Sequence, residues 1–525
     1  MSAGTLILDL VVGLGLGAAF LAQMLRWLRV LQREHYEPSS MRRFLGRWSS
    51  PQVSSAKSVE RSKKSRPITL SHLLALGLLA AVVFRADVAA AFVTIAYGVL
   101  CPVGLSIKGR TSELQWTRRL TTVFVLTTLV AVLCALGGAF TGRPWLLALA
   151  MVWAVPVLLD LGARVLGPYE RRRAQKFVDQ AVERLARVKP RIVAITGSYG
   201  KTSTKNHLAD LLGGNEGVVA SPRSFNNQAG LSRAINENLA DGTRIFIAEM
   251  GTYGSGEIAE LCSWCPPEIA VVTAIGPVHL ERMKSIDVVE KAKYEITEHA
   301  TTVVVNIDDS RLALWPERLS NAGKKVRTAG SKNRLASVRV RDLDGEWVVG
   351  VDGEDVTTMR PIAGVQPTNL ACALAAALEL GVTTSELASR LGRVTTVANR
   401  SNVVTAASGV MVIDDTFNAN PASALAALAL LTSLPLSGRR VVVTPGLIEL
   451  GPDQYGENFS FAQKVAVNGV ELVVVGRTNA KPLQLGFERP PRRFDTRDQA
   501  VAWVRSTLVA GDGVLYLNDL PDHYP

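Results

Sequence analysis

The sequence predicts an N-terminal region of transmembrane helices, then a parallel-sheet α/β domain with a phosphate-binding loop, then a smaller Rossmann-like α/β domain. Three observations carry this prediction. The first third of the 525 residues holds five apolar stretches close to the length that crosses a bilayer. A β-branched run ends in the glycine-containing loop Gly197-Ser-Tyr-Gly-Lys-Thr202. From that loop onward, apolar strand patterns alternate with helical patterns.

The apolar stretches of the first third carry almost no charge, and the chain has 48% hydrophobic residues and a mean hydropathy of +0.19. We expect residues 1–170 to form a membrane region of about five transmembrane helices. Alternatively, the second and third stretches form a re-entrant hairpin, which leaves both flanks on the same side. The five stretches are residues 6–25, 68–84, 88–107, 121–140 and 145–166.

The net charge of +12 is concentrated near the membrane region. Residues 26–66 contain eleven Lys and Arg against three Glu and lie between two apolar stretches. The expected partner is therefore the anionic surface of a lipid bilayer and not nucleic acid, since no basic-aromatic binding motif accompanies the charge. Lys and Arg favour the cytoplasmic side, so this loop and the run Arg171-Arg-Arg173 predict a multi-pass protein with cytoplasmic catalytic domains.

The loop after the buried run 192–195 is suited to binding phosphate. Gly197 and Gly200 permit backbone angles that point N–H groups at an anion, and the following helix presents its positive end. Lys201 supplies a positive charge, and the hydroxyl of Thr202 can bind Mg²⁺. The loop is shorter than a Walker A loop, which would need glycine at the position of Ile195. These residues predict ATP and Mg²⁺ as ligands.

Other candidate site residues follow the strands of the predicted parallel sheet, at the edge where such sheets bind ligands. Glu249 directly follows one strand, and His279 comes shortly after the next. A carboxylate and an imidazole near Thr202 are reasonable partners for Mg²⁺ bound to phosphate. A lone histidine in a loop is more often a hydrogen-bonding surface residue. The strands of this sheet are predicted at 192–195, 244–248, 269–273 and 302–305.

These segments resemble the Mur ligases, the ATP-dependent amide ligases that build the peptide of bacterial peptidoglycan, and among them the member that adds D-alanyl-D-alanine. The resemblance implies that Lys201 and Thr202 contact the γ-phosphate and Mg²⁺, with Ser198 and Ser203 in the same nucleotide loop. Glu249 and His279 would be metal ligands. Lys293 falls where the family often has a carbamoylated lysine, a carboxylate formed on the amine that bridges metal.

The same resemblance extends to asparagines around the site. Asn226 and Asn227, in Ser224-Phe-Asn-Asn-Gln-Ala-Gly230, match the family's loop on the substrate side. Asn306 matches an asparagine on the adenine side. The family usually has a His-Asn pair in the segment 364–369, and this chain keeps only the later residue, Asn369.

The last third resembles the family's closing domain, with strands predicted at 410–413, 440–443, 472–475 and 514–517. The segment 412–421 resembles the family's Asp-Asp-Ser-Tyr-Asn-Ala-Asn-Pro sequence. By this match Asp415 touches the nucleotide, and Asn418 and Asn420 help place the incoming amine. Arg400 stands where the family has an arginine that contacts the γ-phosphate. The family's Lys-Gly-Ser-Arg ending is missing from the C-terminus.

The resemblance covers roughly residues 190–517 and omits the soluble domain that grips a uridine-diphosphate sugar, because membrane stretches stand in its place. We therefore expect a membrane region at 1–170, a central ATP-binding domain at 171–394 and a C-terminal domain at 395–525. The predicted protein is a ligase of the bacterial cell membrane that activates a lipid-linked or envelope-precursor carboxylate as an acyl phosphate and joins it to an amino acid or dipeptide amine. Two alternatives are a poly-γ-glutamate-type capsule synthetase and a nucleotide-driven transporter.

Overall fold

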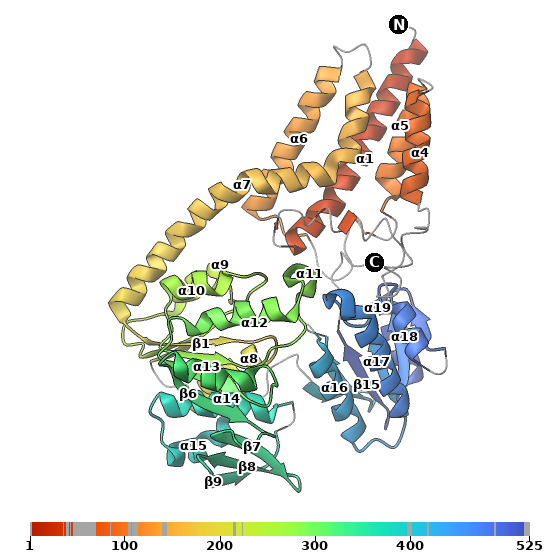
Figure 1. The fold of residues 1–525 in the computed structure, drawn as a ribbon. Coiled ribbons are helices and arrows are strands. Elements are labelled where there is room, and N and C mark those ends of the chain that lie inside the picture. The colour runs from red at the N-terminus through yellow and green to blue at the C-terminus, as the bar shows by residue number, and fades with distance from the viewer. Residues whose placement is uncertain are drawn as a thin grey trace.

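The computed structural model has three parts along the chain: a bundle of apolar helices, a central domain on a nine-stranded sheet and a C-terminal domain on a six-stranded sheet (Figure 1). This arrangement confirms the predicted fold class. The structure describes residues 3–34, 36–37, 41, 44–45, 70–83, 86–102, 105, 107, 114–138, 144–213, 217–222, 224–362, 364–395, 402–416, 419–487 and 490–518.

All five predicted apolar stretches contain helices. Three of these helices, α1 (Ala3–Arg33), α6 (Arg118–Gly138) and α7 (Pro144–Val188), are long and apolar enough to cross a membrane. Two shorter helices, α4 (Leu70–Val83) and α5 (Asp87–Leu100), lie side by side and have 14 residues each (Figure 1). Fourteen helical residues rise about 21 Å, against about 30 Å for the hydrocarbon core. Their described length therefore suits the re-entrant hairpin, and the number of spans stays a prediction.

The outer surface of the bundle carries large apolar side chains that no protein atoms cover. Leu14, Leu76 and Leu133 are 68%, 58% and 59% exposed. A continuous apolar surface of this kind is unfavourable in water, and soluble monomers rarely have one. The exposure therefore favours lipid as the medium around these helices.

Inside the bundle, α1 and α5 approach closely at small residues. A Cβ placed on Gly98 would lie 2.4 Å from the Cβ of Ala19, so only glycine fits at this crossing. The C-terminal carbonyls of α5, which lack partners within the helix, accept hydrogen bonds from α1. Arg26 Nη1 donates to Gly98 O at 2.7 Å, and Gln23 Nε2 donates to Cys101 O at 2.6 Å. The buried cation also complements the negative end of α5.

The charged segment 171–187, whose spaced apolar residues predict a linking helix, is helical but does not form a helix of its own. The structure has one helix, α7, which runs from the bundle to the central domain and contains Pro156 and Pro168 (Figure 1). Proline removes one helical hydrogen bond and bends a helix without always ending it, so both prolines are accommodated.

The central sheet has the order β2-β3-β1-β4-β5-β6-β7-β8-β9, parallel from β2 to β7 and antiparallel from β7 to β9. In the register of β1 and β3, Glu249 pairs with Ile195, so its carboxylate stands beside the start of the phosphate loop. The strands are β1 (Arg191–Thr196), β2 (Val218–Ala220), β3 (Ile245–Glu249), β4 (Ile269–Val272), β5 (Thr302–Asn306), β6 (Lys325–Gly330), β7 (Val338–Leu343), β8 (Glu346–Val351) and β9 (Glu354–Met359).

Helices cover both faces of this sheet, as expected for a parallel sheet whose strands are apolar throughout. The end of α7 packs with α9, α10 and α13 on one face, and α8, α14 and α15 pack on the other. The helices of the domain are α8 (Lys201–Leu211), α9 (Gln228–Asn238), α10 (Glu257–Trp264), α11 (Leu280–Met283), α12 (Ile286–Tyr294), α13 (Trp315–Asn321), α14 (Pro367–Glu379) and α15 (Thr384–Arg390).

The C-terminal sheet has the order β10-β11-β15-β12-β13-β14 and is parallel except for β10. All four strands predicted for it are present. Its strands are β10 (Asn402–Thr405), β11 (Met411–Asp415), β12 (Arg440–Thr444), β13 (Glu471–Val475), β14 (Arg492–Phe494) and β15 (Gly513–Leu517). Its helices are α16 (Pro421–Ser433), α17 (Gln454–Val467), α18 (Ala480–Gly486) and α19 (Arg497–Thr507).

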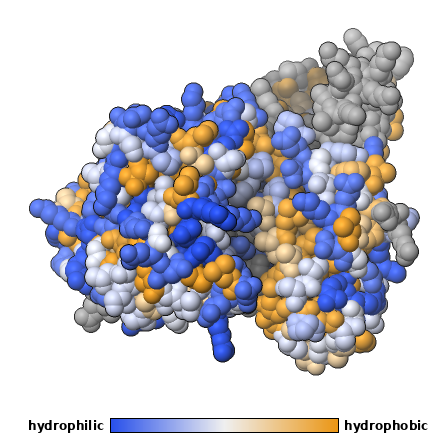
Figure 2. Space-filling model, turned by 60° about the horizontal axis from the view of Figure 1, so that its bottom comes forward, coloured by the Kyte–Doolittle hydropathy of each residue, from blue (hydrophilic) through white to orange (hydrophobic). Residues whose placement is uncertain are grey.

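A groove separates the central and C-terminal domains on the face turned away from the bundle (Figure 2). On the side of the bundle the two domains touch, and α11 of the central domain lies beneath the lower end of the helices (Figure 1).

The close approach of α1 and α5 predicts the effect of one added methyl group. Gly98→Ala should destabilise the bundle by about 1–3 kcal/mol, because its Cβ would overlap Ala19. The matched control is Gly17→Ala in α1, where nothing lies within 4 Å of the new Cβ. Thermal unfolding of the full chain in detergent should show a lower midpoint for Gly98→Ala alone. Equal midpoints for the two variants would contradict this packing.

Candidate active site

The phosphate loop joins the end of β1 to the start of α8. Gly197 and Gly200 have φ values of 154° and 81°, in the range that favours glycine. A Cβ on Gly200 would lie 2.2 Å from Asn369 Oδ1, and one on Gly197 would lie 1.9 Å from Thr273 Oγ1. The loop therefore needs both glycines for backbone conformation and for space, and the positive end of α8 points at it.

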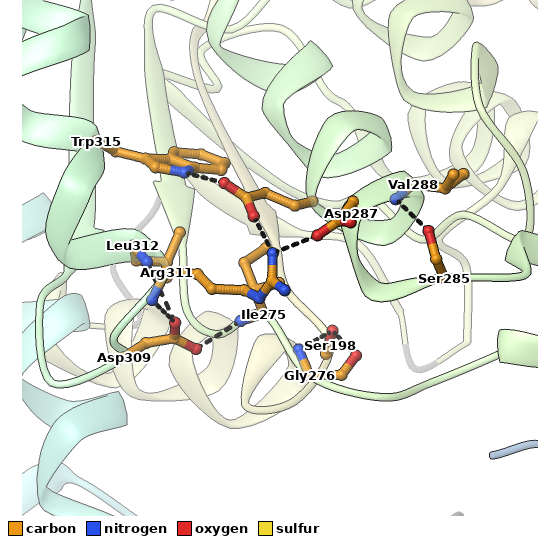
Figure 3. Close-up of polar contacts among 11 residues, drawn as sticks. Ser198, Ile275, Gly276, Ser285, Asp287, Val288, Asp309, Arg311, Leu312 and Trp315 are labelled. Carbon is orange, nitrogen blue, oxygen red and sulfur yellow. Dashed lines mark hydrogen bonds and ion pairs between the residues drawn. The ribbon is translucent and has the colours of Figure 1, made fainter. Parts of the chain in front are cut away.

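Side chains of the loop are held by neighbouring backbone. Lys201 Nζ donates to Gly197 O at 2.6 Å, which places the ammonium over the loop itself. Ser198 Oγ donates to Gly276 O at 3.0 Å, and Gly276 N lies 2.9 Å from the same hydroxyl (Figure 3). The phosphate loop is thus fixed to the segment that follows β4.

A charged network that sequence analysis did not assign supports this segment from the other side (Figure 3). Asp309 Oδ2 accepts from Ile275 N at 2.8 Å, and Asp309 Oδ1 accepts from Arg311 N at 2.9 Å. Arg311 Nη1 reaches Glu290 at 2.7 Å and Asp287 at 2.8 Å on α12, and these bonds raise the pKa of Arg311. The network holds α12 against the loop after β4. The sequence feature that could have identified this network is Asp309, which lies three residues after the end of the buried strand β5.

Glu249 is the centre of the polar cluster beside the loop. Its Oε1 accepts from Thr202 Oγ1 at 3.2 Å and from Asn226 Nδ2 at 3.3 Å. Its Oε2 lies 3.3 Å from Lys205 Nζ, and both side chains are 3% exposed. Lys205 also donates to Ser221 O at 2.7 Å. Sequence analysis identified Thr202, Asn226 and Glu249 and missed Lys205, although Lys205 follows Lys201 by one helical turn.

The charge state of Glu249 follows from these contacts. Burial alone would raise the pKa of its carboxyl, and this is the largest single effect. The charges of Lys205 and Lys201 and the hydrogen bonds from Thr202 and Asn226 together outweigh burial and lower that pKa below its ordinary value. Glu249 is therefore an ionised carboxylate at neutral pH.

Lys293 lies on α12 and is completely buried. Within the described part of the chain its ammonium has no hydrogen bond and no ion pair. Burial, and secondarily the charge of Lys201, hold the pKa of Lys293 well below its usual value. The lowered pKa increases the fraction of this amine that is neutral and therefore nucleophilic.

His279 lies at the contact between the two ligase domains. Its Nδ1 is 2.5 Å from Glu449 Oε2, which belongs to the loop after β12 of the C-terminal domain. Burial works to raise the pKa of Glu449, but the bond and charge of His279, with Arg282, hold that pKa below its ordinary value. Among the described residues, no group of three His, Cys, Asp or Glu side chains is placed to hold a metal ion. The metal role of His279 stays a prediction.

The candidate asparagines of the central domain are engaged by protein groups. Asn306 Nδ2 donates to Thr273 O at 2.7 Å, so Asn306 ties the end of β5 to the end of β4. Asn369, at the start of α14, lies against Gly200 of the loop. Asn227 caps α9 by accepting from Gly230 N at 2.9 Å.

In the C-terminal domain, Asp415 is buried at the end of β11, and its backbone oxygen accepts from Asn518 N at 3.0 Å. Asn420 caps α16 and accepts from Ser423 N at 2.9 Å. Ser203 lies in the first turn of α8 in the central domain. The two remaining candidates, Arg400 and Asn418, lie outside the described residues.

Known proteins match the two domains that carry these residues. Residues 195–378 match the Mur ligase middle domain, and residues 399–517 match the Mur ligase, glutamate ligase domain. The UDP-N-acetylmuramoyl-tripeptide–D-alanyl-D-alanine ligase of Mycobacterium tuberculosis is 35% identical over 368 residues, which cover 62% of this chain and 69% of that protein. This chain belongs to the Mur ligase family. Both domain matches begin after α7, so the apolar helices lie outside them.

Other Mur ligases show the same relationship. The ligase of the same name from Escherichia coli is 28% identical over 298 residues, covering 55% of this chain and 64% of that protein. MurF from Acinetobacter baumannii has the same fold over 66% of this chain and 77% of its own, with a TM-score of 0.57 at 22% identity. MurF ligase from Thermotoga maritima matches 66% of this chain and 80% of its own, with a TM-score of 0.56 at 24% identity.

As a Mur ligase, this chain is an ATP-dependent amide ligase.

The buried ion pair of Lys205 and Glu249 should be essential for stability. Lys205→Met leaves Glu249 buried without its closest cation, so the free energy of unfolding should fall by roughly 3 kcal/mol or more. Chemical denaturation of the full chain measures this. The matched control is Arg187→Met, which removes an exposed pair with Asp241 and should cost less than about 1 kcal/mol.

The pH dependence separates a lost charge partner from lost packing. In the unsubstituted protein the pKa of Glu249 is lowered on folding, so its contribution is present above the unfolded pKa and is lost as pH falls through the folded pKa. Lys205→Met removes much of that contribution. The stability difference between the two proteins should therefore shrink toward acid pH, and adding Glu249→Gln to Lys205→Met should recover part of the loss. A difference that is constant with pH would contradict an electrostatic origin.

Proposed function

We propose that this Mur ligase is anchored in the bacterial cell membrane and joins the carboxylate of an envelope precursor to the amine of an amino acid or dipeptide. The observation that carries the proposal is α7. This helix begins in the apolar bundle, ends at Val188, and is followed by β1 at Arg191, the strand that leads into the phosphate loop. The catalytic core therefore follows the membrane region with no domain between them.

Basic residues support a cytoplasmic position for the catalytic domains. Arg118 and Arg119 begin α6, whose first turn lies at the end of the bundle nearest the ligase domains (Figure 1), and Arg171–173 lie on α7. Lys and Arg of short loops favour the cytoplasmic side. ATP is abundant there, and anionic headgroups of the bilayer attract the same residues.

The names of the relatives bear on the substrates. Those proteins are ligases of UDP-N-acetylmuramoyl-tripeptide and D-alanyl-D-alanine. We propose the same reaction class here, with a lipid-linked or membrane-associated acid in place of a soluble one. The reason is that apolar helices occupy the part of the chain before the Mur ligase middle domain.

The chemistry has two steps. The substrate carboxylate attacks the γ-phosphorus of ATP, ADP leaves, and an acyl phosphate forms. The amine then attacks the acyl carbon, inorganic phosphate leaves, and the nitrogen loses a proton to give the amide. Lys201 and the positive end of α8 stabilise negative charge on the transferred phosphoryl group. Arg400 and Asp415 are proposed to approach the nucleotide from the C-terminal domain, whose closure keeps water from the acyl phosphate.

The donor atoms beside the loop fit Mg²⁺. The hydroxyl of Thr202 and the ionised carboxylate of Glu249 are 3.2 Å apart and are the oxygen ligands this ion prefers. Mg²⁺ usually takes only one or two carboxylates, with phosphate oxygens and water completing its shell. When bound, the ion supplies positive charge to the phosphate oxygens. His279 and Lys293 are proposed as further contributors.

Phosphate release tests the proposal. Full-length protein in detergent receives ATP and Mg²⁺, with or without a lipid extract of the host envelope and with or without amino acids plus D-alanyl-D-alanine. We expect release that needs the extract and the amine together, because the acyl phosphate forms on the acid and is consumed by the amine. Lys201→Ala should abolish release, since it removes the charge over the phosphate loop.

The other outcomes discriminate between the alternatives. A ladder of products containing glutamate would identify a polymerising capsule synthetase and contradict a single addition. Fast release that needs neither acid nor amine would contradict the proposed ligase reaction and favour a nucleotide-driven transporter.

We propose that Lys293 is carbamoylated, because its lowered pKa favours the neutral amine, which attacks CO₂ and loses a proton to give a carbamate. Protein equilibrated with carbon-13 bicarbonate should therefore show one protected carbamate resonance by NMR. The resonance should vanish in Lys293→Ala and persist in the control Lys325→Ala, whose amine is exposed. A spectrum without the resonance would contradict carbamoylation of Lys293.

A further inference from the structure

The cytoplasmic end of α1 is attached to the central domain through one arginine. Arg282, on α11, places Nη2 at 2.9 Å from Glu34 Oε2 and Nη1 at 3.1 Å from Glu37 Oε2. The side chains of Arg282 and Glu34 are only 15% and 7% exposed. A guanidinium that binds two carboxylates with little solvent is held far more firmly than an exposed ion pair.

From Arg282 the contacts continue to the C-terminal domain. The guanidinium lies over the ring of Tyr253, 4.7 Å from its centre, and that ring meets His279 edge to face at 4.6 Å. His279 binds Glu449 of the C-terminal domain, and Leu280 N donates to Glu449 O at 2.9 Å. A continuous set of contacts therefore joins α1, the central domain and the C-terminal domain.

The loop after β12 also touches the bundle directly. Ile448 packs against the apolar cluster of the bundle, which includes Trp27, Met41 and Phe44. The next residue, Glu449, has φ of 62°, a backbone conformation that is unfavourable for residues other than glycine. Contacts on both sides of Glu449 hold it in this conformation.

Arg282 brings a positive charge to a junction where three carboxylates meet. It binds Glu34 and Glu37 and attracts Glu449. Without this charge, the buried carboxylate of Glu34 would repel the partly exposed carboxylate of Glu449. The loop of the C-terminal domain would then move away from α11.

The junction belongs to the same chain segment that contacts the phosphate loop, so it can affect the nucleotide site. The segment that carries His279 and Arg282 begins at the end of β4, and its Gly276 is bonded to Ser198 of the phosphate loop. Figure 1 shows α11 between the bundle and the C-terminal domain. A change at α11 is therefore transmitted to both walls of the groove seen in Figure 2.

We propose that Arg282 is a positioning residue through which the membrane region sets the placement of the C-terminal domain over the nucleotide site. The anchor then has a second role besides attachment, since its cytoplasmic end helps to assemble the active site. This inference does not depend on which acid or amine the enzyme uses.

The distance between the two ligase domains tests the proposal. Spin labels are attached at Ser389→Cys of α15 and Ser506→Cys of α19 in full-length protein in lipid nanodiscs. Cys134→Ser removes the described cysteine that is not buried. The distance between the labels is measured with a non-hydrolysable ATP analogue and Mg²⁺. Both labelled positions are exposed. We expect one narrow distance distribution for the unsubstituted junction and a broad, longer one for Arg282→Ala. Arg282→Lys should restore most of the narrow component, because it keeps the positive charge.

Two further variants and a turnover assay distinguish loss of the junction from a general loss of structure. Arg187→Ala, which breaks an exposed pair, should leave the distribution narrow. Glu34→Gln with Glu37→Gln removes the contact from the side of α1 and should broaden it while leaving Arg282 in place. In turnover assays, Arg282→Ala should lower kcat by about tenfold with little change in KM for ATP, since domain placement and not the phosphate loop is altered. An unchanged distribution in folded Arg282→Ala protein would overturn the proposal.

The result also separates this inference from the proposed substrates. The distance measurement needs no acid and no amine, so it stands even if the phosphate-release assay points to a different reaction. A broadened distribution together with an inactive lipid extract would leave the junction supported and the substrate proposal contradicted.

Discussion

The buried pair of Glu249 and Lys205 is the interaction on which the catalytic edge of the central sheet depends. Two charged side chains, each 3% exposed, are stabilised there by their mutual charge and by hydrogen bonds to Thr202, Asn226 and Ser221. The same carboxylate fixes Thr202 of the phosphate loop and Asn226 of the next segment, so three separate parts of the chain meet at one anion. The backbone pairing of β1 and β3 by itself places Glu249 beside Ile195. Backbone pairing and charge pairing thus enforce the same geometry.

A second constraint comes from the way the membrane region is joined to the ligase. One connection is covalent, through α7, whose end packs into the core under the central sheet. The other is the contact of Arg282 with Glu34 and Glu37 at the opposite side of the domain. One connection would leave the domain free to rotate about the helix. Two connections fix its orientation, so the groove between the ligase domains has a defined direction relative to the bundle.

Local sequence signals were enough for the phosphate loop and for the strands around it, β1, β3, β4 and β5, because β-branched runs and the two loop glycines act within a few residues. The same signals located Glu249 and Asn226, since both follow predicted strands or match a short motif. They could not reveal the pairing of His279 with Glu449, which joins residues 170 positions apart. Strands β7 and β9 were missed because both mix exposed polar or charged residues with apolar ones. Strands β2, β6, β8, β10 and β14 were not predicted either. The continuity of α7 was hidden by its two prolines, which usually end a helix but here lie inside one.

The position of the junction bears on how such an enzyme meets a membrane-bound acid. Holding a catalytic site at a surface replaces a search through solution with a search in two dimensions and raises the effective concentration of a substrate on that surface. That gain requires the site to be held at a fixed position relative to the surface, and a flexible tether would lose much of it. Glu34 and Glu37 follow directly after α1, whose apolar residues pack in the bundle, so their contacts with Arg282 fix the ligase domains relative to α1. If the bundle is anchored in the membrane as proposed, the ion pairs of Arg282 also orient the ligase domains relative to the membrane.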